Sequence, residues 1–243
     1  AFDESVTKVL FVPDECVGVV HADSYELYHE EGKRLLVVPQ QRQGTLKPVD
    51  KGGFADFMLK EMYEQKRAIS ATIDALRATA SFDYPLPWQA VRKVYLVAAG
   101  TSWHAGRIAQ FFFELVAGLP TRVFLASEFR YMPFFPETDA LYIFISQSGE
   151  TADTLEALRL VSRHQLPTLA LTNVATSSIV REASAYLLMH AGPEIAVAST
   201  KAFVSTLGVL NICALALARL KDPSLNHQDY VRALLAVPSQ IET

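Results

Sequence analysis

The sequence predicts an α/β fold: a five-stranded parallel sheet with flanking helices, preceded by a short β-hairpin segment and a helical arm. Two observations lead to this prediction. From residue 93 onward, apolar runs typical of buried strands alternate with longer segments of helical periodicity, which is the rhythm of a parallel sheet covered on both faces. Residues 1–48 instead alternate over short segments, as antiparallel strands do.

Residues 1–48 are the first segment, and their short alternating runs predict strands joined by a hairpin turn at residues 30–33. The predicted strands are residues 8–12, 17–20, 26–28 and 34–38. They carry too little apolar surface for an independent domain. The chain also begins at Ala1 in the middle of a pattern, so we expect it to be a fragment of a longer protein.

Residues 49–84 are predicted to form a linker and a helical arm. The composition of residues 40–53, with Gln, Pro, Lys and Gly, is typical of a connection. Apolar residues then recur at spacings of three, four and seven, which predicts one amphipathic helix that packs on the following domain or on a second subunit. These residues are Phe54, Phe57, Met58, Met62, Ile69, Ile73 and Leu76. Residues 81–84 with Pro85 and Pro87 should end the arm.

Residues 85–223 are predicted to form the parallel-sheet domain. The expected strands are residues 94–98, 122–125, 141–145, 168–171 and 186–189. The expected helices are residues 103–117, 151–164, 177–182 and 201–220. A five-stranded sheet of this kind commonly has the order 2-1-3-4-5, and its ligand-binding crevice lies between the first and third strands.

The stretch Ser146-Gln147-Ser148-Gly149-Glu150-Thr151 stands where the third buried strand becomes a helix. Backbone N–H groups in a first helical turn have no partner within the helix, and the helix dipole favours negative charge there. Hydroxyl groups add hydrogen-bond donors, and a glycine lets the backbone approach a ligand. The stretch therefore predicts a phosphate site, although Ser148 or Thr151 could also serve simply as a helix cap.

A second hydroxyl-rich stretch, Gly100-Thr101-Ser102, follows the first predicted strand. In the order 2-1-3-4-5 it meets the stretch at residues 146–151 at the crevice where doubly wound sheets bind ligands. Neither stretch has the Gly-x-Gly-x-x-Gly pattern or the Gly-Lys-Ser/Thr of a P-loop, so nucleotide binding is disfavoured.

The composition disfavours nucleic-acid and membrane partners. Lys and Arg number 22 against 26 Asp and Glu, and the basic residues are scattered. The longest apolar stretch near the C-terminus, residues 203–217, is shorter than the ~20 residues of a membrane span, and no secretory segment opens the chain. Two cysteines, Cys16 and Cys213, are too few for a disulfide framework; we expect both to fill core space in a cytoplasmic protein.

Four segments together closely resemble one enzyme family. Residues 99–102, 126–131, 146–154 and 194–203 are similar to the first sugar-isomerase (SIS) domain of the glutamine–fructose-6-phosphate aminotransferases (isomerising), the glucosamine-6-phosphate synthases. The resemblance continues upstream: residues 57–65 look like the segment that joins the glutaminase domain to the isomerase half. Residues 1–48 resemble the end of the glutaminase domain.

The resemblance implies a binding site for fructose 6-phosphate or glucosamine 6-phosphate. The matching positions, which would hold the phosphate and the sugar hydroxyls, are Thr101, Ser102, Ser146, Gln147, Ser148, Thr151, Val197 and Ser199. The family reaction makes glucosamine 6-phosphate and glutamate from fructose 6-phosphate and glutamine, by ammonia transfer followed by aldose–ketose isomerisation. By the same comparison we expect a homodimer with no cofactor and no metal.

Parts of the family pattern have no match in this sequence. The family's glutaminase uses an N-terminal cysteine as nucleophile, whereas this chain starts with Ala1. The second SIS domain, which in the family supplies a Schiff-base lysine, an acid/base glutamate and a histidine from the neighbouring subunit, would follow residues 224–243. We therefore expect this chain to contain no catalytic residue and to be inactive alone. The alternative is a stand-alone SIS module that binds or senses a phosphosugar, although such sensors usually carry a DNA-binding segment, and none is visible here.

Four further residues stay open at this level. Lys201 could form a Schiff base, or it could start a helix behind Ser199. Glu150 and Glu194 could act as acid or base, or could have a structural role such as a carboxylate in a first helical turn. His104 lies next to the Gly-Thr-Ser stretch and could touch a ligand. The histidines show no metal-ligand spacing with cysteines or carboxylates.

Overall fold

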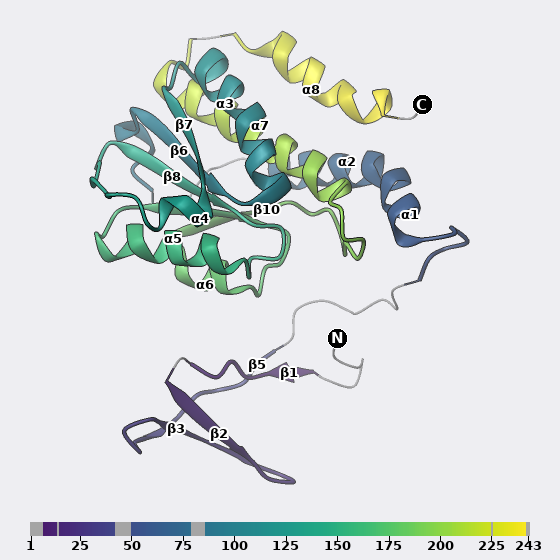
Figure 1. The fold of residues 1–243 in the computed structure, drawn as a ribbon. Helices are drawn as coiled ribbons and strands as arrows, with labels where there is room; N and C mark the ends of the chain where they lie inside the picture. The colour runs from purple at the N-terminus through teal and green to yellow at the C-terminus, as the bar shows by residue number, and fades with distance from the viewer. Residues whose placement is uncertain (1–6, 14, 42–49, 79–85, 225, 242–243) are drawn as a thin grey trace. The chain divides into compact units, whose positions relative to one another are not determined.

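The computed structural model describes residues 7–13, 15–41, 50–78, 86–224 and 226–241 (Figure 1). Its contacts divide the chain into two units, Ala1–Asp50 and Lys51–Thr243, each described by itself. The expected end of the arm at residues 81–85 lies outside the described residues.

The N-terminal unit contains two small antiparallel sheets. Its strands are β1 (Lys8–Val9), β2 (Cys16–Val20), β3 (Tyr25–His29), β4 (Arg34–Leu35) and β5 (Gln40–Gln41). β2, β3 and β4 form one sheet, β1 pairs with β5, and Gly32 takes a positive φ of 78° in the turn between β3 and β4. The prediction was wrong for β5, which lies where a connection was expected, and β1 and β4 are shorter than predicted. An isolated pair such as Gln40–Gln41 forms a strand only because β1 lies beside it.

The arm consists of two helices instead of the single predicted one: α1 (Phe57–Tyr63) and α2 (Gln65–Ala78). The helix is interrupted at Glu64, where the Gln65 side chain donates to the Met62 carbonyl at 3.1 Å and so satisfies a backbone acceptor near the end of α1. α2 packs against α7 (Lys201–Lys221), where Ile69 lies beside Gly208, and Ile69 and Ile73 are both buried. The arm therefore packs on the following domain of its own chain.

The predicted parallel sheet is confirmed. Its strands are β6 (Lys93–Ala98), β7 (Thr121–Leu125), β8 (Ala140–Ile145), β9 (Thr168–Thr172) and β10 (Ala185–Leu188). They are all parallel, in the order β10-β9-β8-β6-β7, which is the expected order 2-1-3-4-5. β6 and β8 lie at its centre, with Ala98 paired to Ile145 at their C-terminal ends.

Helices cover both faces of the sheet (Figure 1). Besides α1, α2 and α7, this unit contains the helices α3 (Gly100–Ala117), α4 (Ala126–Phe129), α5 (Ala152–Arg163), α6 (Ser178–Glu182) and α8 (Gln228–Gln240). Because side chains alternate along a strand, Leu141, Ile143 and Ile145 of β8 point into the core formed with α2, α3 and α7. Tyr142 and Phe144 point into the core formed with α4, α5 and α6.

Some helical elements were not predicted. A short 3₁₀ helix (Trp88–Ala90) and α4 have only three and four residues, too few to show a helical period. α8 lies where residues 224–243 were expected to begin a connection, contacts α2 and contains Pro238. α3 begins at Gly100, three residues before the prediction, because hydroxyl residues in its first turn read as loop.

The two cysteines differ in their surroundings. Cys213 on α7 is fully buried, as expected of a core residue, and burial raises the pKa of its thiol to about 12. Cys16 on β2 is only half-buried, so the prediction of a core position was wrong for it.

Helix α7 has 21 residues, and by length and composition it is long and apolar enough to cross a membrane. The apolar stretch recognised in the sequence, residues 203–217, was shorter and did not predict this. In the structure, 61% of its most apolar window is buried against the rest of the chain, as in the core helix of a globular domain. Its N-terminal turn also contains the buried Lys201.

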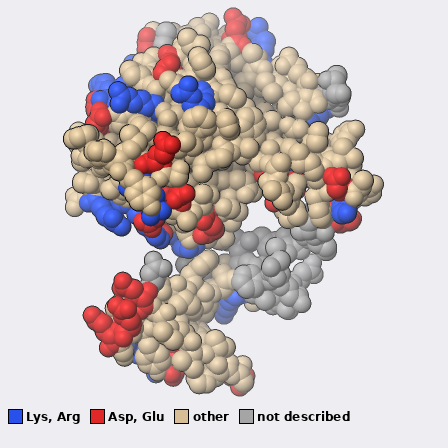
Figure 2. Space-filling model, viewed as in Figure 1, with Lys and Arg blue, Asp and Glu red and all other residues tan. Residues whose placement is uncertain are grey.

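On the face drawn in Figure 2, Lys and Arg lie among Asp and Glu on the larger unit, whereas a group of acidic side chains gathers on the N-terminal unit. This agrees with the near balance of 22 basic and 26 acidic residues. The face shown carries no continuous basic surface of the kind that binds a phosphate backbone.

The layered core leads to a prediction for two leucines on different helices. Leu158 on α5 is 0% exposed within the core, whereas Leu115 on α3 is 82% exposed. Leu158→Ala should lower the free energy of unfolding by about 3–5 kcal/mol, because it removes buried surface and leaves a cavity. Leu115→Ala should change it by no more than about 0.5 kcal/mol. Urea denaturation of both variants checks this, and equal losses would contradict the assigned core.

Candidate functional site

The hydroxyl-rich stretches lie at the C-terminal ends of the two central strands. Ala98 of β6 and Ile145 of β8 are paired neighbours, so the segments that follow them leave the sheet side by side. α3 begins two residues after β6, and the stretch at residues 146–151 leads from β8 into α5. This edge, at the switch point of the strand order, is where open parallel sheets bind ligands.

Hydrogen bonds within the stretch at residues 146–151 fix its shape. The Ser146 hydroxyl accepts from the Gly149 N–H at 3.0 Å and shares a hydrogen bond of 2.9 Å with the Thr151 hydroxyl. The Ser148 hydroxyl accepts from the Glu150 N–H at 3.2 Å. Thr151 is the N-cap residue of α5, but its side chain makes no capping hydrogen bond. The simple capping role considered for Thr151 is therefore not the one it has.

The hydroxyl pair of Ser146 and Thr151 retains one donor. Each hydroxyl has one proton, and only one of the two protons is used in the hydrogen bond between them. The other hydroxyl can donate outward to an acceptor. Ser146 itself is 2% exposed, while Thr151 is half-buried and Ser148 is exposed.

The carboxylates within and just after this stretch are held by partners. Glu150 accepts from the Ser178 N–H at 2.7 Å, at the start of α6, and so has a structural role. Asp153, in the first turn of α5, forms an ion pair of 3.0 Å with Arg130. The pair offsets the negative charge that Asp153 would otherwise place at the N-terminus of α5.

Gly149 is required by its surroundings. Its φ is 69°, and a Cβ built there would lie 2.2 Å from the Ser177 hydroxyl and 2.9 Å from the Thr172 hydroxyl. Its carbonyl accepts from the Ile179 N–H at 3.1 Å. The backbone of the stretch is thus pressed against the segment that follows β9.

The structure corrects the position of Thr101 and Ser102. They lie in the first turn of α3 and not in a preceding loop, with Ala99 as the N-cap. An alanine has no side-chain acceptor, so the cap leaves the first N–H groups of α3 without a capping partner. Thr101 and His104 are exposed and Ser102 is half-buried. The N-terminal turns of α3 and α5 therefore both lie at the same edge of the sheet.

The third predicted group, Val197 and Ser199, lies in the segment at residues 191–200 between β10 and α7. This segment has no regular secondary structure, and side chains hold its backbone. Asn173, which follows β9, accepts from the Ala191 N–H at 2.9 Å and donates to the Gly192 carbonyl at 2.7 Å. Val197 is fully exposed and Ser199 is half-buried.

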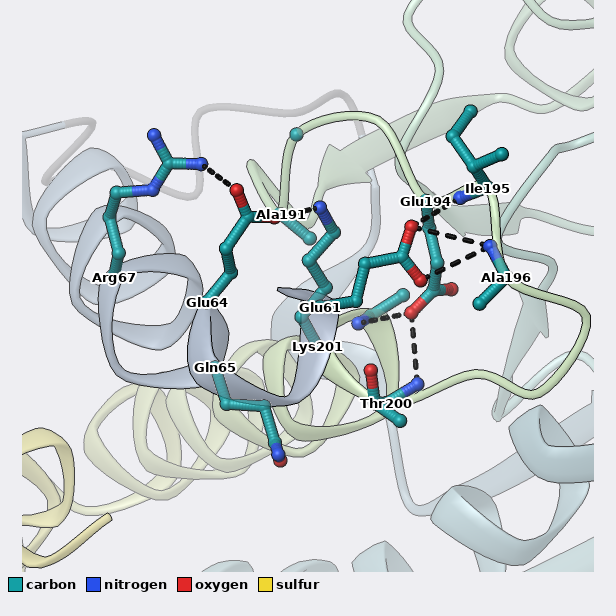
Figure 3. A network of polar contacts seen from close by, with 12 residues as sticks. Glu61, Glu64, Gln65, Arg67, Ala191, Glu194, Ile195, Ala196, Thr200 and Lys201 are labelled. Atoms are coloured by element: carbon teal, nitrogen blue, oxygen red, sulfur yellow. Dashed lines mark hydrogen bonds and ion pairs between the residues drawn. The ribbon is translucent and has the colours of Figure 1, made fainter. Parts of the chain in front are cut away.

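Glu194 caps helix α7 from within the same segment (Figure 3). Its carboxylate accepts from the Thr200 N–H at 2.9 Å, from the Ala202 N–H at 3.1 Å and from the Ser199 hydroxyl at 3.0 Å. Glu194 thus has the structural role considered above. The Ser199 proton is already donated to this carboxylate, so the Ser199 oxygen remains as an acceptor.

The arm contacts the same segment (Figure 3). Glu61 of α1 is 2% exposed and accepts from the Ile195 and Ala196 N–H groups. Lys201, also 2% exposed, donates to Glu64 at 2.5 Å, and Glu64 pairs in turn with Arg67 at 3.1 Å. Lys201 therefore starts a helix as a buried ion-paired residue.

Sequence analysis missed Glu61, Glu64 and Asn173. Glu61 stands four residues after Phe57 and three after Met58, within the apolar stripe of the arm. A carboxylate on an apolar stripe is a signal of a buried partner. The partner itself is 134 residues away in sequence, so the pattern could not identify it.

Among the described residues, no group of three or more His, Cys, Asp and Glu side chains is arranged to hold a metal ion. The donors at this edge of the sheet are hydroxyls, backbone N–H groups and helix N-termini, a set suited to an anion.

Comparison with known proteins identifies related sequences. The SIS domain family matches residues 89–216, more than half of this chain. A protein named glutamine–fructose-6-phosphate aminotransferase [isomerizing] from Acinetobacter baylyi is 42% identical over 227 residues, covering 88% of this chain and 37% of the relative. One of the same name from Methanosarcina acetivorans is 37% identical, covering 100% of this chain and 41% of the relative.

A solved structure is also similar. The C-terminal domain of glucosamine-fructose-6-phosphate aminotransferase from Francisella tularensis has a TM-score of 0.74 and 39% identity, covering 79% of this chain and 56% of that one. The chain spans 37% and 41% of the length of the two curated relatives above.

Gly149 provides a test of the site's geometry. Gly149→Ala should cost more stability than Gly118→Ala by roughly 1–3 kcal/mol, because the added methyl group overlaps Ser177. Gly118, the C-cap of α3, has a similar φ of 60° but no atom within 4 Å of a built Cβ, so it measures the backbone strain alone. Urea unfolding of the two variants gives the difference. Equal losses would contradict the close packing of residue 149.

Proposed function

This chain belongs to the SIS domain family, and on that basis we propose that it is the sugar-phosphate-binding part of a glucosamine-6-phosphate synthase. The whole enzyme would convert fructose 6-phosphate and glutamine into glucosamine 6-phosphate and glutamate. Support comes from relatives of that name at 42% and 37% identity and from the donors that line the edge of the sheet.

A single observation carries the proposal. The paired ends of β6 and β8, Ala98 and Ile145, bring two helix N-termini and their hydroxyl groups to one edge of the sheet. Partial positive charge at both helix ends and outward donors from Thr101, Ser102 and Ser148 favour an anionic group there. The phosphate of the sugar would occupy this position.

The charged groups on the segment at residues 191–200 indicate which part of the site binds the phosphate and which part binds the sugar hydroxyls. Glu194 already fills the N-terminus of α7, and Ser199 has donated its proton to it. A phosphate there would meet the Glu194 carboxylate, and the Ser199 hydroxyl proton is already used, so repulsion disfavours a phosphate at this position. We therefore assign the phosphate to residues 146–151 and the sugar hydroxyls, which can donate to the Ser199 oxygen, to the side of Val197 and Ser199.

The role of this chain in the reaction would be binding and orientation. Hydroxyl and backbone donors would hold the phosphate of the substrate without additional ion pairs to Lys and Arg. Such ion pairs would tighten binding of the substrate without speeding the reaction. Ammonia transfer and proton transfer between sugar carbons would use groups that lie outside this chain, which spans about two fifths of its relatives' length. A homodimer in the cytoplasm belongs to the same proposal.

A stand-alone module that binds a phosphosugar and regulates a partner is the second candidate. The SIS match alone, at residues 89–216, fits it equally well. The Methanosarcina acetivorans relative, which aligns with 100% of this chain and so extends well beyond the SIS match, favours the synthase.

Titration calorimetry with two ligands tests the phosphate site. Glucosamine 6-phosphate should bind, and unphosphorylated glucosamine should bind far more weakly. Ser148→Ala combined with Thr151→Ala should weaken glucosamine 6-phosphate binding by about 3 kcal/mol, or ~100-fold, because two donors to a charged group are lost at ~1.5 kcal/mol each.

Ser162→Ala, near the opposite end of α5, is the matched control and should leave the affinity unchanged. An equal response of the wild-type chain to both sugars would contradict a phosphate site. Unchanged affinity in the double variant would mean that the ligand lies elsewhere.

A further inference from the structure

We propose that Glu61, on the helical arm, is a positioning residue of the sugar-phosphate site: its carboxylate sets the backbone of residues 194–200, the segment assigned to the sugar hydroxyls. The inference rests on the proposed function for the identity of the ligand. It makes the arm a part of the site and not only a connection between domains.

The contacts of Glu61 have the form of a bound anion. One carboxylate oxygen accepts from the Ile195 N–H at 2.5 Å and from the Ala196 N–H at 3.3 Å, and the other accepts from the Ala196 N–H at 3.2 Å. Two successive N–H groups that converge on one anion form a concave backbone site of the kind that often holds phosphate. Here the chain fills that site with its own carboxylate, which is 2% exposed (Figure 3).

The segment at residues 191–200 depends on Glu61 because Asn173 and Glu194 hold only its beginning and its end. Asn173 fixes its beginning at Ala191 and Gly192, and Glu194 fixes its end at Thr200. Between these points lie Ile195 and Ala196, whose N–H groups are held by Glu61. The contact thus stands directly before Val197, which is fully exposed and belongs to the predicted binding set.

The arm is held in place for this role by a second buried contact. Lys201, the first residue of α7, donates to Glu64 at 2.5 Å, three residues beyond Glu61. A buried lysine is costly unless it is paired, so this ion pair fixes the end of α1 against the start of α7. Glu61 therefore approaches the segment from a rigid support.

The two glutamates also decide what the segment can bind. Glu61 and Glu194 occupy the backbone donors at Ile195, Ala196, Thr200 and Ala202. These donors are not available to a phosphate, and the added negative charge repels one. Loss of Glu61 should therefore disturb recognition of the sugar and leave the phosphate contacts at residues 146–151 intact.

The test compares glucosamine 6-phosphate with inorganic phosphate as ligands of this chain. Glu61→Ala and the milder Glu61→Gln should weaken glucosamine 6-phosphate binding, with a loss of about tenfold or more for Glu61→Ala, because charge-assisted hydrogen bonds are removed. Inorganic phosphate binding should change by less than about twofold, since its proposed contacts are residues 146–151 and the N-terminal turn of α3, away from Glu61. Glu114→Gln is the matched control, because Glu114 also accepts a backbone N–H, from Thr121 at the other end of the sheet.

Equal weakening of both ligands in Glu61→Gln, or no weakening of either, would overturn the positioning role. A purely structural role would lower the stability without this difference between the ligands. If the wild-type chain binds neither ligand, the proposed function fails.

Amide hydrogen exchange provides a measurement that needs no ligand. The Ile195 and Ala196 amides should exchange about tenfold faster or more in Glu61→Gln, while amides in the centre of β8 stay protected. Unchanged exchange at Ile195 and Ala196 would overturn the positioning role whatever the outcome for the proposed function.

Discussion

The pairing of β6 with β8 is the constraint on which the site depends. Parallel strands end at the same edge of a sheet, and the register places Ala98 beside Ile145. Two chain segments separated by more than forty residues therefore leave the sheet together and turn at once into helices α3 and α5. Their N-terminal dipoles add at one place, and no basic side chain is needed to make that place attractive to an anion.

Internal carboxylates complete the polar arrangement around this edge. Glu150 holds the start of α6, Glu194 caps α7 and Glu61 holds the segment between β10 and α7. Each of these anions satisfies backbone N–H groups that would otherwise be left without partners. The protein thus assigns some of its backbone anion sites to its own side chains and leaves those of α3 and α5 without a capping side chain.

Sequence patterns predicted the sheet well because its signals are local. Buried strands such as 141–145 are continuous apolar runs, and the alternation of strands and helices restricts the topology to a few orders. Boundaries were less certain: α3 begins at Gly100, and the arm is interrupted at Glu64. Short elements such as α4 and β5 show no period of their own and form only beside their partners.

The sequence by itself determined that hydroxyl-rich stretches follow the first and third strands, because both the stretches and the alternation of strands with helices are patterns of neighbouring residues. Only the tertiary structure decided the roles of the carboxylates and of Lys201. The partners of Glu61 and Lys201 lie 134 and 137 residues away, and a pairing over such a distance leaves no period or spacing in the chain. Burial decides these roles, because a charged group removed from water must find whichever partner the fold places beside it.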